Sequence, residues 1–226
     1  MARRTFDYII KQYNYNAIKY DAMIWLAKTY IQLKEYEKAQ SLLDLVESKK
    51  DKDNISRDAK RALPMVYADM HIKKKDFSLA ISFLEDALYI NRNREILARV
   101  NFILGQIYQN TNDLETSTEY FLSSLKHRPS YEMSFNAKIN LARSYDVTTG
   151  DSKLIIKKLN KMLKDLKNEE FRDQIYYALA EIALKDENDT LAITYLRKSV
   201  ATSTSNNYQK AVSALKLADL YFSYPD

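Results

Sequence analysis

The sequence of 226 residues contains no cysteine, two glycines and three prolines. Without cysteine the chain has no disulfide, no thiolate nucleophile and no cysteine-type zinc site. Two glycines cannot supply the turns of an all-β sandwich or barrel, nor the glycine-rich loop of a phosphate-binding domain. No apolar run approaches the roughly 18 residues needed to cross a membrane. Hydrophobic residues still make up 46% of the chain, so it can bury a core, and α-helix is the structure that remains.

The charge excess is small for a chain with so many charged residues. Thirty-five basic and 30 acidic side chains leave a formal net charge of +5, with a pI of about 9.0. Nucleic-acid binders usually concentrate their basic residues, whereas the basic runs here are as short as Lys73–Lys75. A solvated helical surface is therefore favoured, and nucleic-acid binding is the less favoured alternative.

A short motif recurs along the chain, consisting of a large apolar residue, a small residue, two spacers and usually a tyrosine. Its copies begin at Leu26, Tyr67, Leu104, Leu141, Leu179 and Leu217, at intervals of 41, 37, 37, 38 and 38 residues. Each copy but the last is followed by apolar or small residues at offsets of three, four and seven, as in Ala39, Leu43 and Val46. These offsets define one face of an α-helix, although the fourth copy fits only with one residue inserted near Gly150. Each unit is thus predicted to be two amphipathic helices joined by a short turn.

Helix pairs of this kind cannot cover their own apolar faces, so they are expected to stack. We predict one solenoid over residues 1–226, with the second helix of a preceding repeat at its start and a single first helix at its end. The predicted segments are 5–16, 17–56, 57–93, 94–130, 131–168, 169–206 and 207–226. A chain that begins and ends inside such an array is expected to be a fragment of a longer protein.

These units resemble the tetratricopeptide repeat (TPR) family at nearly every structural position, over about residues 17–226. The resemblance implies an all-α fold, a right-handed superhelical α-solenoid of stacked helix-turn-helix repeats. Two features depart from the family pattern: the turns between repeats are longer, and the tryptophan common near the start of the first helix is missing. Its place is taken by Met23, Pro64, Asn101, Lys138, Tyr176 and Ala214.

Three stretches look like the large TPR lipoproteins of Bacteroidetes, a group that includes the PorW/SprE component of the type IX secretion and gliding machinery. They are residues 6–13, 131–146 and 173–183. The first residues do not form a secretory signal peptide, so this resemblance implies a signal and a lipid anchor upstream of Met1. It further implies a bacterial periplasmic, membrane-anchored scaffold within a secretion or motility machine. A cytoplasmic location remains the alternative.

Nothing in the sequence points to catalysis, and we expect neither a cofactor nor a metal nor a small-molecule substrate. His71 occupies the tyrosine position of its repeat, and His127 lies near a helix end, where a cation is ordinary. Neither histidine has a second ligand four residues on, so a zinc site is not expected. No serine or threonine stands near a histidine and an acid in a way that suggests a nucleophile.

A binding surface is better supported, because the first helices of stacked TPR pairs line the concave side. Family positions that face this groove, carried over onto the present sequence, give Ile24, Lys28, Met65, Asp69, Arg99, Phe102, Gln106, Asn136, Ile139, Arg143, Gln174, Tyr177 and Glu181. The apolar members of this set have an alternative role in helix packing. With so few basic residues among them, a clamp for a C-terminal carboxylate is not expected. An amphipathic or extended protein segment fits better.

The sequence therefore predicts a non-catalytic protein-interaction scaffold that binds a protein or peptide segment. The rival hypothesis is head-to-tail self-assembly through the apolar ends, at residues 8–20 and 215–224. Membrane contact is expected only through the upstream anchor.

Overall fold

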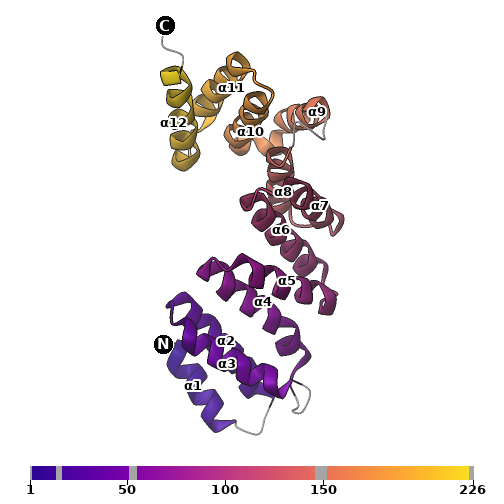
Figure 1. Cartoon of the computed structure of the whole chain (residues 1–226), viewed down its shortest axis with the longest axis vertical. Helices are drawn as coiled ribbons and strands as arrows, with labels where there is room; N and C mark the ends of the chain where they lie inside the picture. Colours follow the sequence, from indigo (N-terminus) through magenta and orange to yellow (C-terminus); the bar gives the residue numbers. More distant parts are fainter. Residues whose placement is uncertain (1, 14–16, 51–54, 146–151, 224–226) are drawn as a thin grey trace. The chain divides into compact units, whose positions relative to one another are not determined.

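A computed structural model describes residues 2–13, 17–50, 55–145 and 152–223. Within these ranges the chain forms twelve α-helices and one 3-10 helix and contains no strand. The predicted all-α repeat fold is confirmed (Figure 1). The insertion predicted near Gly150 lies outside the described residues. The chain divides into two compact units, Met1–Ile107 and Tyr108–Asp226, which are described separately.

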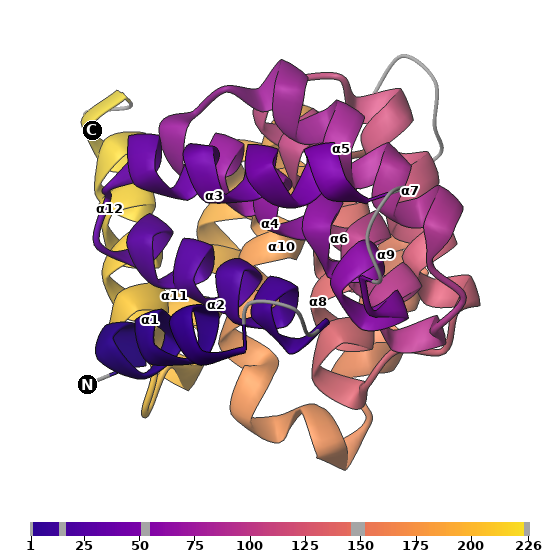
Figure 2. The same cartoon turned by 90° about the horizontal axis from the view of Figure 1, so that it is seen from below.

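Unit 1 consists of antiparallel helix pairs joined by short turns. Its helices are α1 (Ala2–Gln12), α2 (Ile18–Gln32), α3 (Tyr36–Lys49), α4 (Arg57–Lys74), α5 (Phe77–Ile90) and α6 (Arg94–Asn110), the last of which continues into unit 2. Helices α1, α2 and α3 lie side by side (Figure 2). Each pair has the helix-turn-helix form that the repeat motif predicts.

The core of unit 1 is built from the motif residues. Ala27 in α2 and Ala39 in α3 are completely buried, and such small side chains let two helix backbones approach closely. Leu43 and Val46, one helical turn or two beyond Ala39, are also completely buried in the same apolar cluster. The spacing of three, four and seven residues thus places one stripe of α3 against the core.

Unit 2 follows the same scheme with one added element. Its helices are α7 (Leu114–Lys126), α8 (Tyr131–Arg143), α9 (Ser152–Leu163), the 3-10 helix η1 (Leu166–Phe171), α10 (Arg172–Lys185), α11 (Asp189–Thr202) and α12 (Asn207–Ser223). Its apolar cluster includes Phe135, Leu159 and Ile175 from α8, α9 and α10. Helix η1 leads directly into α10, and the ring of Phe171 at its end packs 4.8 Å from that of Phe135.

The short turns use left-handed backbone conformations without glycine. Residues with positive φ end the first helix of several pairs, and they are Lys34, Lys75, Asn112 and Glu187. This conformation costs a residue other than glycine roughly 1–2 kcal/mol of conformational free energy. In three of these turns the next residue, Asp76, Asp113 or Asn188, accepts a hydrogen bond from the backbone N–H three residues on. Such N-caps contribute about 1 kcal/mol each, which largely offsets that strain.

Candidate functional site

A groove in unit 1 is lined mainly by the first helices of three pairs. It has a volume of about 750 Å³, within the range of about 300–1,000 Å³ typical of ligand sites. Helices α2, α4 and α6 supply most of the lining, and we call it the α2–α4–α6 groove. The opposite faces of these helices pack in the core, so the groove exists before any partner binds.

Exposed and half-buried apolar side chains form a large part of this groove. Trp25 of α2, the single tryptophan of the chain, is 54% exposed. Met65 and Ile72 of α4 and Ile96 and Ile103 of α6 are half-buried and belong to the same apolar lining. An exposed tryptophan in a recess with aliphatic neighbours is typical of residues that dominate binding energy at protein interfaces.

Two cations and one carboxylate accompany the apolar side chains. The ammonium of Lys28 lies 4.1 Å from the centre of the Trp25 ring, a cation–π contact. Burial lowers the pKa of Lys28, the nearby Arg99 lowers it further, and Asp69 opposes the shift. Asp69 is itself paired with Lys73 at 3.2 Å. Because Lys28 is partly desolvated beside a second cation, an incoming carboxylate would be attracted to this end of the groove.

The structure places the predicted site residues of unit 1 in two environments. Lys28, Met65, Asp69 and Arg99 line the α2–α4–α6 groove. Ile24 is only 2% exposed and belongs to the apolar core, so it packs helices together and does not face a partner.

On helix α6 a residue that lines the groove is the neighbour of a predicted one. The predicted residues Phe102, half-buried, and Gln106, exposed, are not among the described residues that line the groove, whereas Ile103 is. Sequence reasoning missed Ile103, Ile96 and Trp25. The signal available was the lone tryptophan beside the predicted row, which lies one residue from Ile24 and hence about 100° around the helix.

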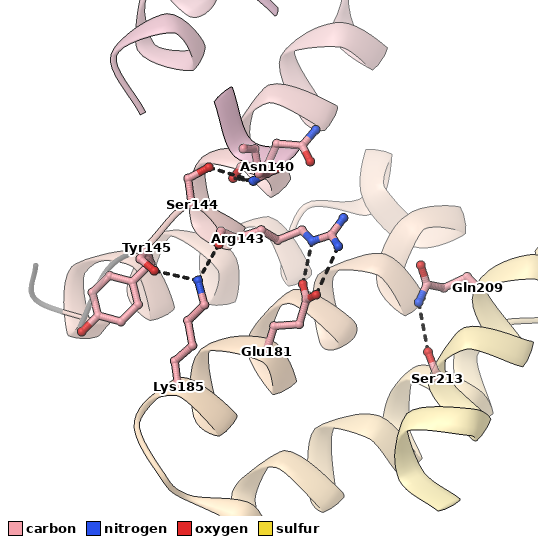
Figure 3. A network of polar contacts seen from close by, with 9 residues as sticks. Asn140, Arg143, Ser144, Tyr145, Glu181, Lys185, Gln209 and Ser213 are labelled. Carbon is pink, nitrogen blue, oxygen red and sulfur yellow. Dashed lines mark hydrogen bonds and ion pairs between the residues drawn. The ribbon is translucent and has the colours of Figure 1, made fainter. Parts of the chain in front are cut away.

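In unit 2 the predicted charged residues bind one another. Arg143 of α8 and Glu181 of α10 form a two-point ion pair, with Nε 2.7 Å from Oε2 and Nη2 donating to Oε1 at 3.2 Å. Figure 3 shows this pair bridging the two helices. Lys185, one turn further along α10, donates to the carbonyl oxygens of Arg143 and Tyr145, both at 2.7 Å. The lysine thereby caps the C-terminal end of α8, where free carbonyls favour a cation.

A second set of polar contacts holds the end of α8 from its other side. Gln109 donates to the carbonyl oxygen of Asn140 at 3.0 Å and to the Ser144 hydroxyl at 2.7 Å. Ser144 in turn lies 2.9 Å from the buried Ser117 hydroxyl of α7. The polar side chains at the end of α8 therefore hydrogen-bond to neighbouring helices (Figure 3).

The remaining predicted residues of unit 2 lie around this network. Ile139 is 7% exposed and part of the core, whereas Asn136, Gln174 and Tyr177 are half-buried. Burial raises the pKa of Tyr177, and Glu181 adds to the shift while Arg143 opposes it. Tyr177 therefore lies within electrostatic reach of the ion pair.

Among the described residues, no cluster of three or more histidine, aspartate or glutamate side chains is able to hold a metal ion. None of the described helices combines the length and the apolar character of a membrane span. His71 is 6% exposed and stacks on Phe83 at 5.5 Å, in keeping with the packing role expected for it.

Comparison with known proteins agrees with the helix pairs described above. A family profile described as tetratricopeptide repeat matches residues 20–47, 65–94 and 98–131. These three segments are similar to tetratricopeptide repeats. They cover α2 and α3, the end of α4 with α5, and most of α6 with α7.

A solved structure shares the fold over nearly the whole chain. It is the apo form of the quorum sensor NprR from B. thuringiensis, with a TM-score of 0.64 and 10% sequence identity. The similarity covers 97% of the present chain but 65% of that chain. At this identity it establishes the TPR-like fold alone. No curated protein sequence matches the chain.

The Arg143–Glu181 pair predicts a pH dependence of stability. Burial raises the pKa of Glu181, while Arg143, Lys185 and Lys216 oppose the shift. A carboxyl whose pKa is raised by folding favours the folded state below its unfolded pKa, and this contribution is lost as pH rises through the folded pKa. The wild-type protein should therefore lose stability relative to Glu181→Gln between about pH 4 and about pH 7.

Denaturant unfolding followed by far-UV circular dichroism at the two pH values measures this difference. Arg143→Gln should enlarge the loss, because it removes the cation that opposes the shift. Glu170→Gln, at an exposed position outside the network, controls for removal of one charge. A difference between wild type and Glu181→Gln that is the same at both pH values would contradict the assignment.

Proposed function

We propose that the chain is a protein-interaction scaffold and that the α2–α4–α6 groove binds a segment of a partner protein. The observation that carries this proposal is Trp25, which is 54% exposed within a preformed groove that also holds Lys28 and Arg99. The TPR segments and the TPR-like fold support an interaction module of this kind.

The side chains of the groove define the chemistry of the segment. An apolar side chain of the partner would pack on Trp25 and Met65, which burial makes favourable by roughly 25 cal/mol per Å² of apolar surface. A carboxylate of the partner would approach Lys28 and Arg99, which fixes the register of the segment more than its affinity. Because the groove is held by the helix core, the partner bears most of the ordering cost.

The expected test begins with selection of peptides from a random displayed library on the purified chain. Selected peptides should carry an apolar residue near an acidic one, and Trp25→Ala should weaken their binding about 10-fold or more, since tryptophan anchors contribute strongly to interface energy. Isothermal titration measures the dissociation constants.

Tyr89→Ala supplies the matched control, because Tyr89 on α5 is 80% exposed and is not one of the described residues lining the groove. This variant should bind the selected peptides within about twofold of wild type. Equal affinity of the Trp25→Ala variant and the wild type would argue against the groove as the binding site.

We further propose a cell-envelope setting, in which the scaffold belongs to a lipid-anchored periplasmic machine for secretion or motility. The support is the resemblance of residues 6–13, 131–146 and 173–183 to the large Bacteroidetes TPR lipoproteins. Capture experiments from detergent-solubilised envelope and from cytosol of the source cell compare the two settings. Specific capture of envelope proteins by wild type, lost with Trp25→Ala, is expected. Capture of proteins from the cytosol alone would contradict the cell-envelope setting, but it would not contradict the scaffold proposal.

Head-to-tail self-assembly is the second candidate function, and exposed apolar side chains favour it. Phe222 and Leu215 of α12 are 89% and 68% exposed, and Tyr8 of α1 is 61% exposed. Burial of such side chains between copies would drive stacking. Light scattering over a concentration series should then show a mass that grows with concentration and falls back with Phe222→Ser. A constant monomer mass would rule it out.

A further inference from the structure

One position of the repeat motif holds a different residue in each copy, and the surface beside it differs as well. It lies three residues before the apolar residue that opens the motif, and Pro64, Lys138 and Tyr176 occupy it in α4, α8 and α10. The surface beside this position is occupied by side chains in α10 and forms a groove in α8.

Tyrosine occupies this position in α10. The ring of Tyr176 stacks on Tyr195 of α11 with centroids 6.4 Å apart. The ammonium of Lys198 lies over both rings, 5.7 and 5.8 Å from their centres. Two aromatic rings and the lysine stem thus occupy the surface between α10 and α11.

A groove lies beside this position in α8. Lys138 is exposed, and a groove of about 430 Å³ lies beside it between α7, α8 and α9. Aliphatic side chains dominate its lining, among them Leu122 of α7, which is 42% exposed, and Ile155 and Met162 of α9. We call this recess the Lys138 groove.

Several contacts fix the end of the Lys138 groove. The Tyr131 hydroxyl donates to Asn168 Oδ1 at 2.5 Å, and the Asn168 amide donates to the carbonyl oxygen of Met162 at 2.9 Å. Asn168 is 4% exposed, so these hydrogen bonds are shielded from water and hold η1 against α9. The groove is therefore a defined feature of unit 2.

Positive charge surrounds the Lys138 groove. Of the described residues that line it, Lys138, Lys158 and Lys161 are basic, and Asp165 alone is acidic. Helix α9 has four lysines and no acidic residue along its twelve positions. The groove beside Pro64 differs, because its four basic side chains face the three carboxylates of Asp44, Glu47 and Asp86.

We propose that the Lys138 groove is a second docking surface and that it takes an acidic amphipathic segment of a partner protein. Apolar side chains of the segment pack on Leu122 and Ile155, and its carboxylates pair with the lysines at the rim. Aliphatic side chains outnumber the two aromatic ones, Tyr131 and Phe135, in the lining, and Phe135 is buried. This composition favours a peptide over a nucleic acid, because single-stranded bases bind by stacking on successive aromatic faces. The proposal is independent of the α2–α4–α6 groove, which lies in the other unit.

The test uses synthetic helical peptides of about 14 residues, or about four turns. All have leucine along one face, and the other face is glutamate, glutamine or lysine. Fluorescence anisotropy should show that the glutamate peptide binds the whole chain and that the lysine peptide does not. The double variant Lys138→Glu with Lys161→Glu should lower the affinity for the glutamate peptide about 10-fold or more, which is equivalent to about 1.4 kcal/mol of binding free energy.

Matched variants separate the groove from general charge attraction. Lys157→Glu with Lys164→Glu makes the same charge change at exposed positions outside the lining, and it should weaken binding by about threefold at most. Leu122→Ala should lower the affinity for the glutamate peptide about fivefold. Leu154 is an exposed leucine of α9 outside the lining, so Leu154→Ala should leave this affinity unchanged. Circular dichroism of each variant verifies the helical fold.

Four outcomes would overturn the proposal. The first is an equal loss of affinity for the glutamate peptide in the Lys138/Lys161 and Lys157/Lys164 double variants, and the second is binding of the lysine peptide as tight as that of the glutamate peptide. The third is loss of glutamate-peptide binding in Trp25→Ala, and the fourth is no binding of the glutamate peptide to the wild type up to about 1 mM. The same titrations with a single-stranded oligonucleotide of about 12 nucleotides test the other polyanion. Tighter, Lys138-dependent binding of the oligonucleotide would assign the surface to nucleic acid instead.

Discussion

Close approach of helices at small side chains is the constraint on which the rest of this structure depends. Ala27 and Ala39 are completely buried between α2 and α3, and Ala180 and Ala192 are completely buried in α10 and α11. A larger residue at such a position would force the helices apart and cost roughly 1–3 kcal/mol or more. Because each helix uses one stripe for this contact, its other side chains are left for neighbouring pairs and for solvent.

The same packing that closes the core creates the recesses. With Ile24 and Leu26 buried against neighbouring helices, Trp25 between them points outward into the α2–α4–α6 groove. The groove is therefore lined mainly by helical residues, which pack against the core on their other side. Binding surfaces of this kind cost little to organise, since the receptor is already ordered before the partner arrives.

Charge is used in contrasting ways in the two units. In unit 2, Arg143, Glu181 and Lys185 join α8 to α10, so these side chains contribute to the internal structure. In unit 1, Lys28 and Arg99 line an open groove. Lys28 and Arg143 occupy equivalent repeat positions, and the next first helix has a carboxylate at that position in each case, Asp69 or Glu181. Glu181 pairs with Arg143, whereas Asp69 pairs with Lys73 of its own helix. The pairing of the carboxylate therefore decides how each cation is used.

The sequence by itself determined that the chain is an all-α array of helix pairs, because the recurring motif and its offsets reflect local helical periodicity. It also identified part of the groove lining, including Lys28, Met65, Asp69 and Arg99. Only the tertiary structure distinguished Ile24 from Trp25, since one residue rotates a side chain by about 100° and the direction of the core is set by neighbouring helices. The Lys138 groove was likewise decided there, because side chains of three consecutive helices line it and the local helical pattern does not record how these helices pack against one another.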